Sequence, residues 1–224
     1  MKKHFLLIAI FLIAASTAFA NVELCFNNYF IPSSTRTYRC PDGDVANAAY
    51  SLTGSETNLS IYFGREKKNL DVGINGAFGM EYFRVVSFDW TDFSVKFAGE
   101  LTASLGPIFR YTFSDIHSVS ICPALQFNAG FLWDRILNIY GQFDFAFAVN
   151  AMYKCYFLNV DGFHLGLNLG LGYSKPFSGA FTGLSLSHDG VKLQNSTDLI
   201  SGHDIRIYVG MCMNFGDRGR DRKN

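Results

Sequence analysis

The feature that most constrains this chain is an alternation of bulky apolar residues with small or polar ones, which recurs along almost its whole length. The clearest segment is 163–174, where every second residue is large and apolar: Phe163, Leu165, Leu167, Leu169, Leu171 and Tyr173. A period of two is that of a β-strand with two chemically different faces. The pattern repeats at 22–31, 57–64, 70–83, 93–113, 119–131, 142–157 and 204–215. We therefore predict eight strands.

Side-chain volume decides which face of these strands points inward. The interior of an eight-stranded barrel is just wide enough to be filled by side chains, and this chain carries 23 Phe and 11 Tyr in addition to its Leu and Ile. The Gly, Ala, Ser and Asn of the other face fit such an interior, whereas the bulky residues do not. The apolar face must then contact lipid, because in water it would be a very large exposed patch. A closed barrel also satisfies every backbone polar group, as hydrocarbon demands.

The composition excludes several other classes of protein. Hydrophobic residues make up 49% of the chain and charged residues 17%, below the roughly 25% of a soluble domain. A disordered chain would be less hydrophobic and more highly charged. The 19 basic residues are matched by 19 acidic ones, so we expect no nucleic-acid partner. We predict an all-β fold, a closed antiparallel up-and-down transmembrane β-barrel of eight strands.

The first twenty residues have the pattern of a secretory signal peptide. A basic start at 1–3 precedes a compact apolar stretch at 5–15 and a small-x-small motif that ends at Ala20. We expect cleavage between Ala20 and Asn21. The alternative, a retained anchor helix, is disfavoured because the apolar run is short for the roughly 20 residues of a membrane span. The domains expected are a signal peptide at 1–20, a barrel at 21–216 and a short polar tail at 217–224.

The connections between the expected strands fall into a short and a long class. Outer-membrane barrels have short periplasmic turns and longer outer loops. The expected inner turns are 65–69, 114–118 and 158–162, and the expected outer loops are 32–56, 84–92, 132–139 and 175–203. Within the last loop, residues 183–187 and 191–194 could form one more hairpin. Ten strands are therefore the alternative to eight.

Two stretches carry a resemblance to a known group of proteins. The segment Leu105–Phe113 and the terminal strand that ends in Met213, Asn214 and Phe215 resemble small outer-membrane barrels of the OmpA/OmpX/OmpW type. The resemblance implies the outer membrane of a diderm bacterium, and a terminal aromatic residue, here Phe215, that the barrel-assembly machinery reads. The tail beyond Phe215 is too short for a periplasmic domain. We expect a monomer.

The inward face of the predicted barrel carries charged residues, which have two interpretations. They could line a conduit for small solutes, or they could form a charge-paired plug, because buried charges must be paired or hydrogen-bonded. We favour the plug. Glu81 and Lys96 are equidistant from the centre of the 84–92 loop, so we expect them to face each other across the hairpin. The predicted network is Glu81, Lys96, Glu100, Arg110, Asp144, Lys154 and Arg206, and the same face carries Glu23, Asp71 and Asp204.

Five cysteines in an exported chain leave at least one without an intramolecular partner. Cys25 and Cys212 both point inward near the periplasmic end, on strands that adjoin where the barrel closes, so a disulfide between them is possible. Cys122 and Cys155 are on neighbouring strands but on opposite faces. Cys40 lies in the first outer loop. Five reduced thiols remain the alternative.

The sequence contains no zinc-type spacing and no Gly-x-Ser-x-Gly motif, so we expect no enzymatic activity, no cofactor and no metal. The function expected is a structural or surface-interaction scaffold that displays loops 32–56 and 175–203 to an extracellular ligand. The alternatives are an OmpW-like conduit for small solutes and a lipid-modifying enzyme at the outer rim. The architectural alternative is a soluble lipocalin-like barrel. The partners expected besides such a ligand or solute are membrane lipid and the barrel-assembly machinery.

Overall fold

A computed structural model describes residues 21–39, 45–63, 69–88, 95–134, 138–160, 162–187, 190–193 and 197–216. The predicted signal peptide and the polar tail lie outside these residues. The strands are β1 (Asn21–Arg39), β2 (Val45–Tyr62), β3 (Leu70–Phe88), β4 (Val95–Ser114), β5 (His117–Asp134), β6 (Asn138–Val160), β7 (Phe163–Ser187), β8 (Gly190–Leu193) and β9 (Thr197–Phe215). No helix among the described residues is long and apolar enough to cross a membrane.

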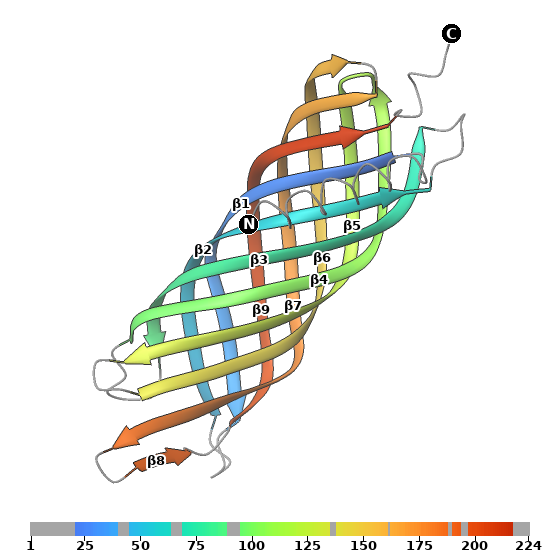
Figure 1. Cartoon of the computed structure of the whole chain (residues 1–224). Helices are drawn as coiled ribbons and strands as arrows, with labels where there is room; N and C mark the ends of the chain where they lie inside the picture. The colour runs from blue at the N-terminus through green and yellow to red at the C-terminus, as the bar shows by residue number, and fades with distance from the viewer. Residues whose placement is uncertain are drawn as a thin grey trace.

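The strands close into a ring of eight. Each strand from β1 to β7 pairs antiparallel with the next, β9 pairs with β7, and β1 pairs with β9 to close the barrel (Figure 1). The prediction of an eight-stranded antiparallel barrel is confirmed. The hairpin that suggested ten strands also forms, because β8 pairs with Leu184–Ser187 at the end of β7. Within the described residues β8 contacts no strand of the ring besides β7, so this hairpin prolongs the wall and does not cross the membrane again.

The turns at one end of the barrel are short, as predicted. Asp115 and Ile116 form the turn between β4 and β5, inside the expected range 114–118. Gly162 lies between β6 and β7 with a φ of 77°, a left-handed conformation that glycine adopts without steric cost. The third expected inner turn, 65–69, falls mostly outside the described residues. Strand β9 ends at this same end of the barrel, opposite to β8 (Figure 1).

The predicted long outer loops are wrong, because the strands continue through them. β1 runs on to Arg39 and β2 begins at Val45, so most of 32–56 is a paired hairpin. β7 continues to Ser187 and β9 begins at Thr197, which removes most of the loop expected at 175–203. Beyond a bilayer both faces of a strand can be polar. The hydrophobic alternation therefore stops there, although the backbone pairing persists.

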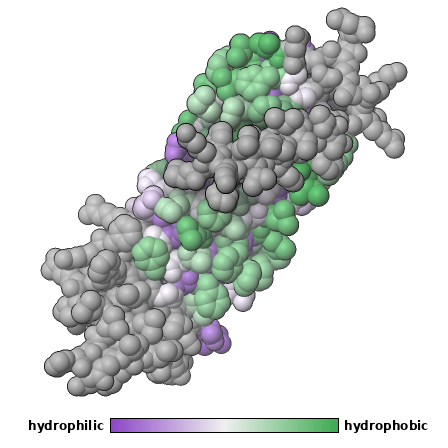
Figure 2. All heavy atoms as spheres, viewed as in Figure 1, coloured by the Kyte–Doolittle hydropathy of each residue, from purple (hydrophilic) through white to green (hydrophobic). Residues whose placement is uncertain are grey.

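The apolar face points outward, as predicted. Leu105 is 63% exposed and Leu171 61% exposed, and every strand of the ring contributes large exposed apolar residues. In Figure 2 apolar side chains cover much of the described part of the visible face. The inward positions are occupied mostly by buried polar and charged residues, but also by bulky ones such as Tyr62 and Tyr208, which the volume argument placed outside too broadly. The chain therefore presents an apolar belt around a polar interior, which is the arrangement of a barrel surrounded by hydrocarbon.

We predict that charge is poorly tolerated within this belt and well tolerated above it. Leu169→Arg places a cation in the middle of the outward row of β7 and should lower the free energy of unfolding from lipid vesicles by about 2–4 kcal/mol. Ser201→Arg, on the outward row of β9 beyond the belt, should change it by less than about 1 kcal/mol. Denaturant unfolding in vesicles measures both variants. Equal, small effects would mean that Leu169 does not face hydrocarbon.

Candidate functional site

The candidate functional site is the lumen, to which all eight ring strands contribute inward side chains. These side chains form three layers along the barrel. A lower cluster of charges is centred on Glu23, and an upper cluster is centred on Arg36 and Arg206. A layer rich in amide side chains lies between the two clusters.

Glu23 of β1 is the centre of the lower cluster and is fully buried. Its carboxylate accepts a hydrogen bond from Lys154 of β6 and pairs with Arg110 of β4 at 3.5 Å. It also accepts hydrogen bonds from the hydroxyls of Tyr156 at 2.5 Å and Tyr62 at 3.2 Å. Four donors on three other strands therefore satisfy one buried carboxylate, which is the condition under which a buried charge is tolerated.

Arg110 extends the lower cluster to two further strands. Its guanidinium donates to Asp71 of β3 through Nε at 3.0 Å and Nη2 at 2.7 Å. Nη1 donates to Asn214 of β9 at 3.1 Å. The guanidinium also lies 3.9 Å from the centre of the Tyr62 ring, within the range of a cation–π contact. The charges of Glu23, Asp71, Arg110 and Lys154 balance.

The middle layer is held mainly by amide and hydroxyl hydrogen bonds, with Glu56 as an additional acceptor, and little space remains in it. Asn168 donates to Asn27 at 2.5 Å, and Asn27 donates to Glu56 at 3.3 Å. Asn75 donates to Ser60 at 2.9 Å. The cavity that remains among these side chains has a volume of about 20 Å³. That is roughly the room one water molecule needs.

The upper cluster contains a bidentate ion pair between Arg36 of β1 and Asp204 of β9. The two Nη–Oδ distances are 2.7 and 2.9 Å. Ser34 donates to the same carboxylate. Arg36 Nε lies 3.6 Å from Asp144 of β6, which also accepts a hydrogen bond from Asn128 at 2.6 Å. The cluster therefore joins the closing strands β1 and β9 to β6, which pairs with neither of them.

Arg206 and Glu81 form the other half of the upper cluster. Arg206 donates to Glu81 at 3.0 Å and to Gln126 at 2.7 Å, and the Tyr29 hydroxyl donates to Glu81 at 2.6 Å. Glu100 is buried directly opposite Glu81 in the β3–β4 pair. It makes no ion pair or hydrogen bond within the described residues. Like charges opposite each other on paired strands are destabilising.

The structure places the predicted inward charges in the lumen with one exception. Glu81, Arg110, Asp144, Lys154 and Arg206 all take part in the two clusters, and Glu100 lies beside the upper one. The exception is Lys96, whose side chain the structure does not describe, so its inward position remains a prediction.

The expected partnership of Glu81 with Lys96 is wrong. The register puts Glu100, four residues along β4, opposite Glu81. The hairpin between β3 and β4 turns later than the assumed centre of 84–92. Because four is an even number, this shift in the β3–β4 register leaves residues 96 and 100 on the same face of β4 and changes only which of them is opposite Glu81.

Arg36 is the arginine of the lumen network that the sequence analysis missed, as it also missed Glu56. Arg36 lies in the range assigned to an outer loop. It also has an even number, whereas the inward residues at the start of β1 have odd numbers. Tyr29 and Ile31 point inward, but after a register irregularity between Ile31 and Ser34 the even-numbered residues Ser34 and Arg36 do so. Such a bulge inserts one residue and reverses the faces. The proline at position 32 in this irregularity was the available signal, because proline within a strand marks a bulge or an edge.

The cysteines at the closing seam face each other. Cys25 of β1 is directly opposite Cys212 of β9, and both are buried in the lumen beside Tyr156. Both are free thiols in this structure, so the disulfide remains a prediction. Cys122 pairs in register with Asn150, and Cys155 pairs with His117. Cys40 lies outside the described residues. Phe215 ends β9, and its role as an assembly signal also remains a prediction.

Comparison with solved structures finds this architecture in outer-membrane proteins. A major outer membrane protein from Thermus thermophilus is 12% identical, with a TM-score of 0.52 over 84% of this chain and 99% of that one. The outer membrane protease OmpT from Escherichia coli is 7% identical, with a TM-score of 0.45 over 87% and 97% of the two chains. Ail, the attachment invasion locus protein of Yersinia pestis, is 12% identical, with a TM-score of 0.38 over 86% and 98%.

The chain has the fold of a small outer-membrane β-barrel. No family model and no curated protein sequence matches it. At 12% identity, the likeness to the Thermus thermophilus protein shows the fold alone and leaves the activity open. The apolar belt around the closed ring adds a physical reason for the location, because only lipid solvates such a surface. The bacterial outer membrane is the bilayer that holds small barrels of this type.

Among the described residues no group of three or more His, Cys, Asp or Glu side chains could hold a metal ion. Apart from Glu100, the acidic side chains of the upper cluster pair with Arg36 or Arg206, and these pairs link different strands of the ring.

We predict opposite effects for two neighbouring carboxylates of the upper cluster. Glu81→Gln removes the charge that pairs with the buried Arg206 and should lower the free energy of unfolding by about 3–5 kcal/mol. Glu100→Gln removes only a like-charge repulsion and should leave that free energy unchanged or raise it. The two variants are matched in size and depth. Denaturant titrations followed by heat-modifiable gel mobility compare them, and equal losses would contradict the assigned partners.

We predict that the seam cysteines are the pair that oxidises. When the reduced chain refolds in a glutathione redox buffer, Cys25 and Cys212 should join as glutathione disulfide is reduced to two thiols. Residues directly opposite on antiparallel strands bring their Cβ atoms to about 4.5–5.5 Å, near the disulfide range. Peptide mass spectrometry without reductant identifies the bond. Cys122→Ser should not affect it. A bond between Cys122 and Cys155, or none at all, would contradict the prediction.

Proposed function

We propose that this protein is a closed scaffold in the outer membrane that carries strand extensions and their connecting hairpins to the outer surface for interaction with a partner. The observation that carries the proposal is the filled lumen. Two charge clusters and an amide layer occupy it, and the cavity between the clusters has room for about one water molecule. A solute could pass only by displacing these described side chains.

The interaction part of the proposal rests on the strand extensions. β7 continues to Ser187 and pairs there with β8, and β1 and β2 pair as far as Arg39 and Val45. A paired hairpin is a more rigid support for a binding surface than an unpaired loop of the same length. Binding residues are commonly found on connections that a rigid scaffold positions. We assign the partner-binding surface to these hairpin ends.

The same packing argues against the alternative of a conduit for small solutes. A conducting path would require separating Arg110 from Glu23 and Asp71, and Arg36 from Asp204, all of which are buried. Separating a buried ion pair costs about 3–5 kcal/mol. The proposal also assigns no catalytic step to the barrel.

We predict that the purified, reconstituted protein does not conduct. Liposomes that contain it should swell in arabinose at the rate of empty liposomes, because two charge clusters and an amide layer fill the part of the lumen that the structure describes. Liposomes with a wide porin provide the positive control, and heat-modifiable mobility confirms that the barrel is folded. Solute-selective swelling above the empty-liposome rate would favour the conduit instead. Replacement of both hairpin ends by short glycine-rich turns should leave the mobility unchanged.

A further inference from the structure

The outward row of β2 breaks the apolar belt. Thr53, Ser55 and Thr57 are exposed on this row, where most ring strands carry Phe, Leu, Ile or Val. The neighbouring outward row of β3 carries large side chains, Phe78, Met80 and Tyr82, all of which are exposed. The small side chains of β2 beside these large ones leave a depression along the strand.

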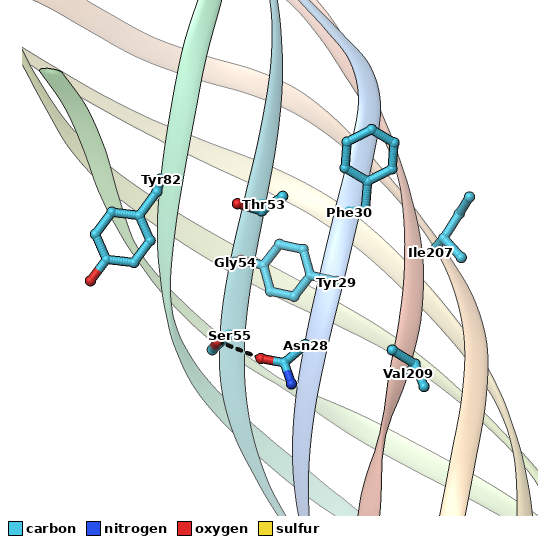
Figure 3. A pocket seen from close by; sticks show the side chains of 9 residues that line it. All are labelled: Asn28, Tyr29, Phe30, Thr53, Gly54, Ser55, Tyr82, Ile207 and Val209. Atoms are coloured by element: carbon cyan, nitrogen blue, oxygen red, sulfur yellow. Dashed lines mark hydrogen bonds between the residues drawn. The ribbon is translucent and has the colours of Figure 1, made fainter. Parts of the chain in front are cut away.

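This depression consists of two hollows that meet at one hydrogen bond. The outer hollow, of about 400 Å³, lies over Thr53 and Gly54, between Phe30, Tyr82 and two apolar residues of β9 (Figure 3). The inner hollow, of about 260 Å³, lies between Phe26 and Phe78. Both hollows are lined by Asn28 and Ser55. Together they form a groove, which we call the β2 groove.

The β2 groove lies within the lipid-facing surface. Asn28 is directly opposite Val209, which belongs to the outward apolar row of β9. Tyr82, whose hydroxyl lies 2.7 Å from the Met80 sulfur, forms the outer wall. Tyrosine at such a position is typical of the membrane interface. The groove therefore runs from the interface into the hydrocarbon region, and it is continuous with the belt.

The Asn28 side-chain amide in the groove has hydrogen-bond donors without an acceptor among the described residues. Ser55 donates to the Asn28 side-chain oxygen at 2.7 Å, which leaves the two N–H donors of the Asn28 amide without a partner among the described residues. An amide donor in hydrocarbon costs free energy unless an acceptor meets it. Glu56 also lines the inner hollow, but it is buried and bound by Asn27 and Asn58. The ligand should therefore be apolar and uncharged, with one acceptor.

We propose that the β2 groove binds one acyl chain of a membrane lipid, with the carbonyl oxygen of the chain accepting a hydrogen bond from the Asn28 amide. The methylenes lie along the β2 row between the walls of β1 and β3. A second copy of the barrel fits less well, because a two-fold contact would place one hollow against another and fill neither. This inference depends on the lipid-facing belt and is independent of the proposed scaffold function.

The test is photo-crosslinking in nanodiscs with the full mature chain. The probe is phosphatidylethanolamine that carries a diazirine on one acyl chain close to its ester carbonyl. Crosslinks mapped by mass spectrometry should concentrate on the groove strands β1 and β2. Ser55→Leu fills the groove with a residue typical of the belt and should lower the crosslinked fraction about fivefold. Ala151→Leu, a matched change on the outward row of β6, should leave it unchanged.

A second comparison tests the hydrogen bond separately. An unlabelled ester-linked lipid should displace the probe about fivefold better than its ether-linked analogue, which lacks the carbonyl; this corresponds to about 1 kcal/mol. In Asn28→Leu the two lipids should compete equally. Heat-modifiable mobility verifies the fold of each variant.

Three results would overturn the proposal. Crosslinks spread evenly around the wall would mean that the groove holds no particular chain. An unchanged yield in Ser55→Leu would mean that the probe does not lie in the groove. If two barrels associated through the groove and the lipid probe no longer labelled it, the surface would be assigned to a second copy.

Discussion

The structure depends on one constraint: hydrocarbon surrounds the wall, so every backbone polar group must be paired within it. The ring of eight strands closed by β1 and β9 meets that requirement. Closure then determines where side chains go. The bulky residues are already committed to the outside, and the narrow interior must be filled by what remains. The result is a wall with most of its described Phe and Leu exposed and with the Glu, Asp, Arg and Lys of the two clusters buried.

The buried charges complement the backbone pairing because they join strands that are not neighbours. Backbone hydrogen bonds connect each strand only to the two beside it. Glu23 of β1, by contrast, reaches β4 and β6, and Arg36 connects β1 to β6 through Asp144. A buried pair is weak evidence for stability, since desolvation offsets much of its attraction. In a narrow lumen, however, such pairs fill space and brace the wall by joining strands that backbone pairing does not connect.

The sequence predicts whether most residues face the lumen or the lipid, but not their position along the barrel axis or the residue that they contact. Period-two alternation correctly predicted the ring, the outward Phe and Leu and the inward charges, because parity is a local property. It failed at Arg36, where an irregularity after Ile31 reverses the faces. It also failed for Glu81, whose partner depends on where the hairpin turns. The contacts across the lumen, such as Lys154 to Glu23, depend on the stagger of the whole ring, which no single segment encodes.

The outer wall poses the opposite problem to the lumen. Most polar side chains inside the barrel find partners on other strands, with Glu100 as an exception, because the interior brings eight strands within reach of one another. A polar group on the outside has only its two neighbouring strands and the lipid. The Asn28 amide oxygen accepts a hydrogen bond from Ser55 on one neighbouring strand, and its nitrogen has no partner among the residues that the structure describes. The acceptor that completes it must come from the surrounding molecules, and in a bilayer the acceptors closest to the hydrocarbon are the carbonyl oxygens where the acyl chains begin. The unpaired donor on the lipid-facing wall therefore determines which chemical group of the lipid can bind there.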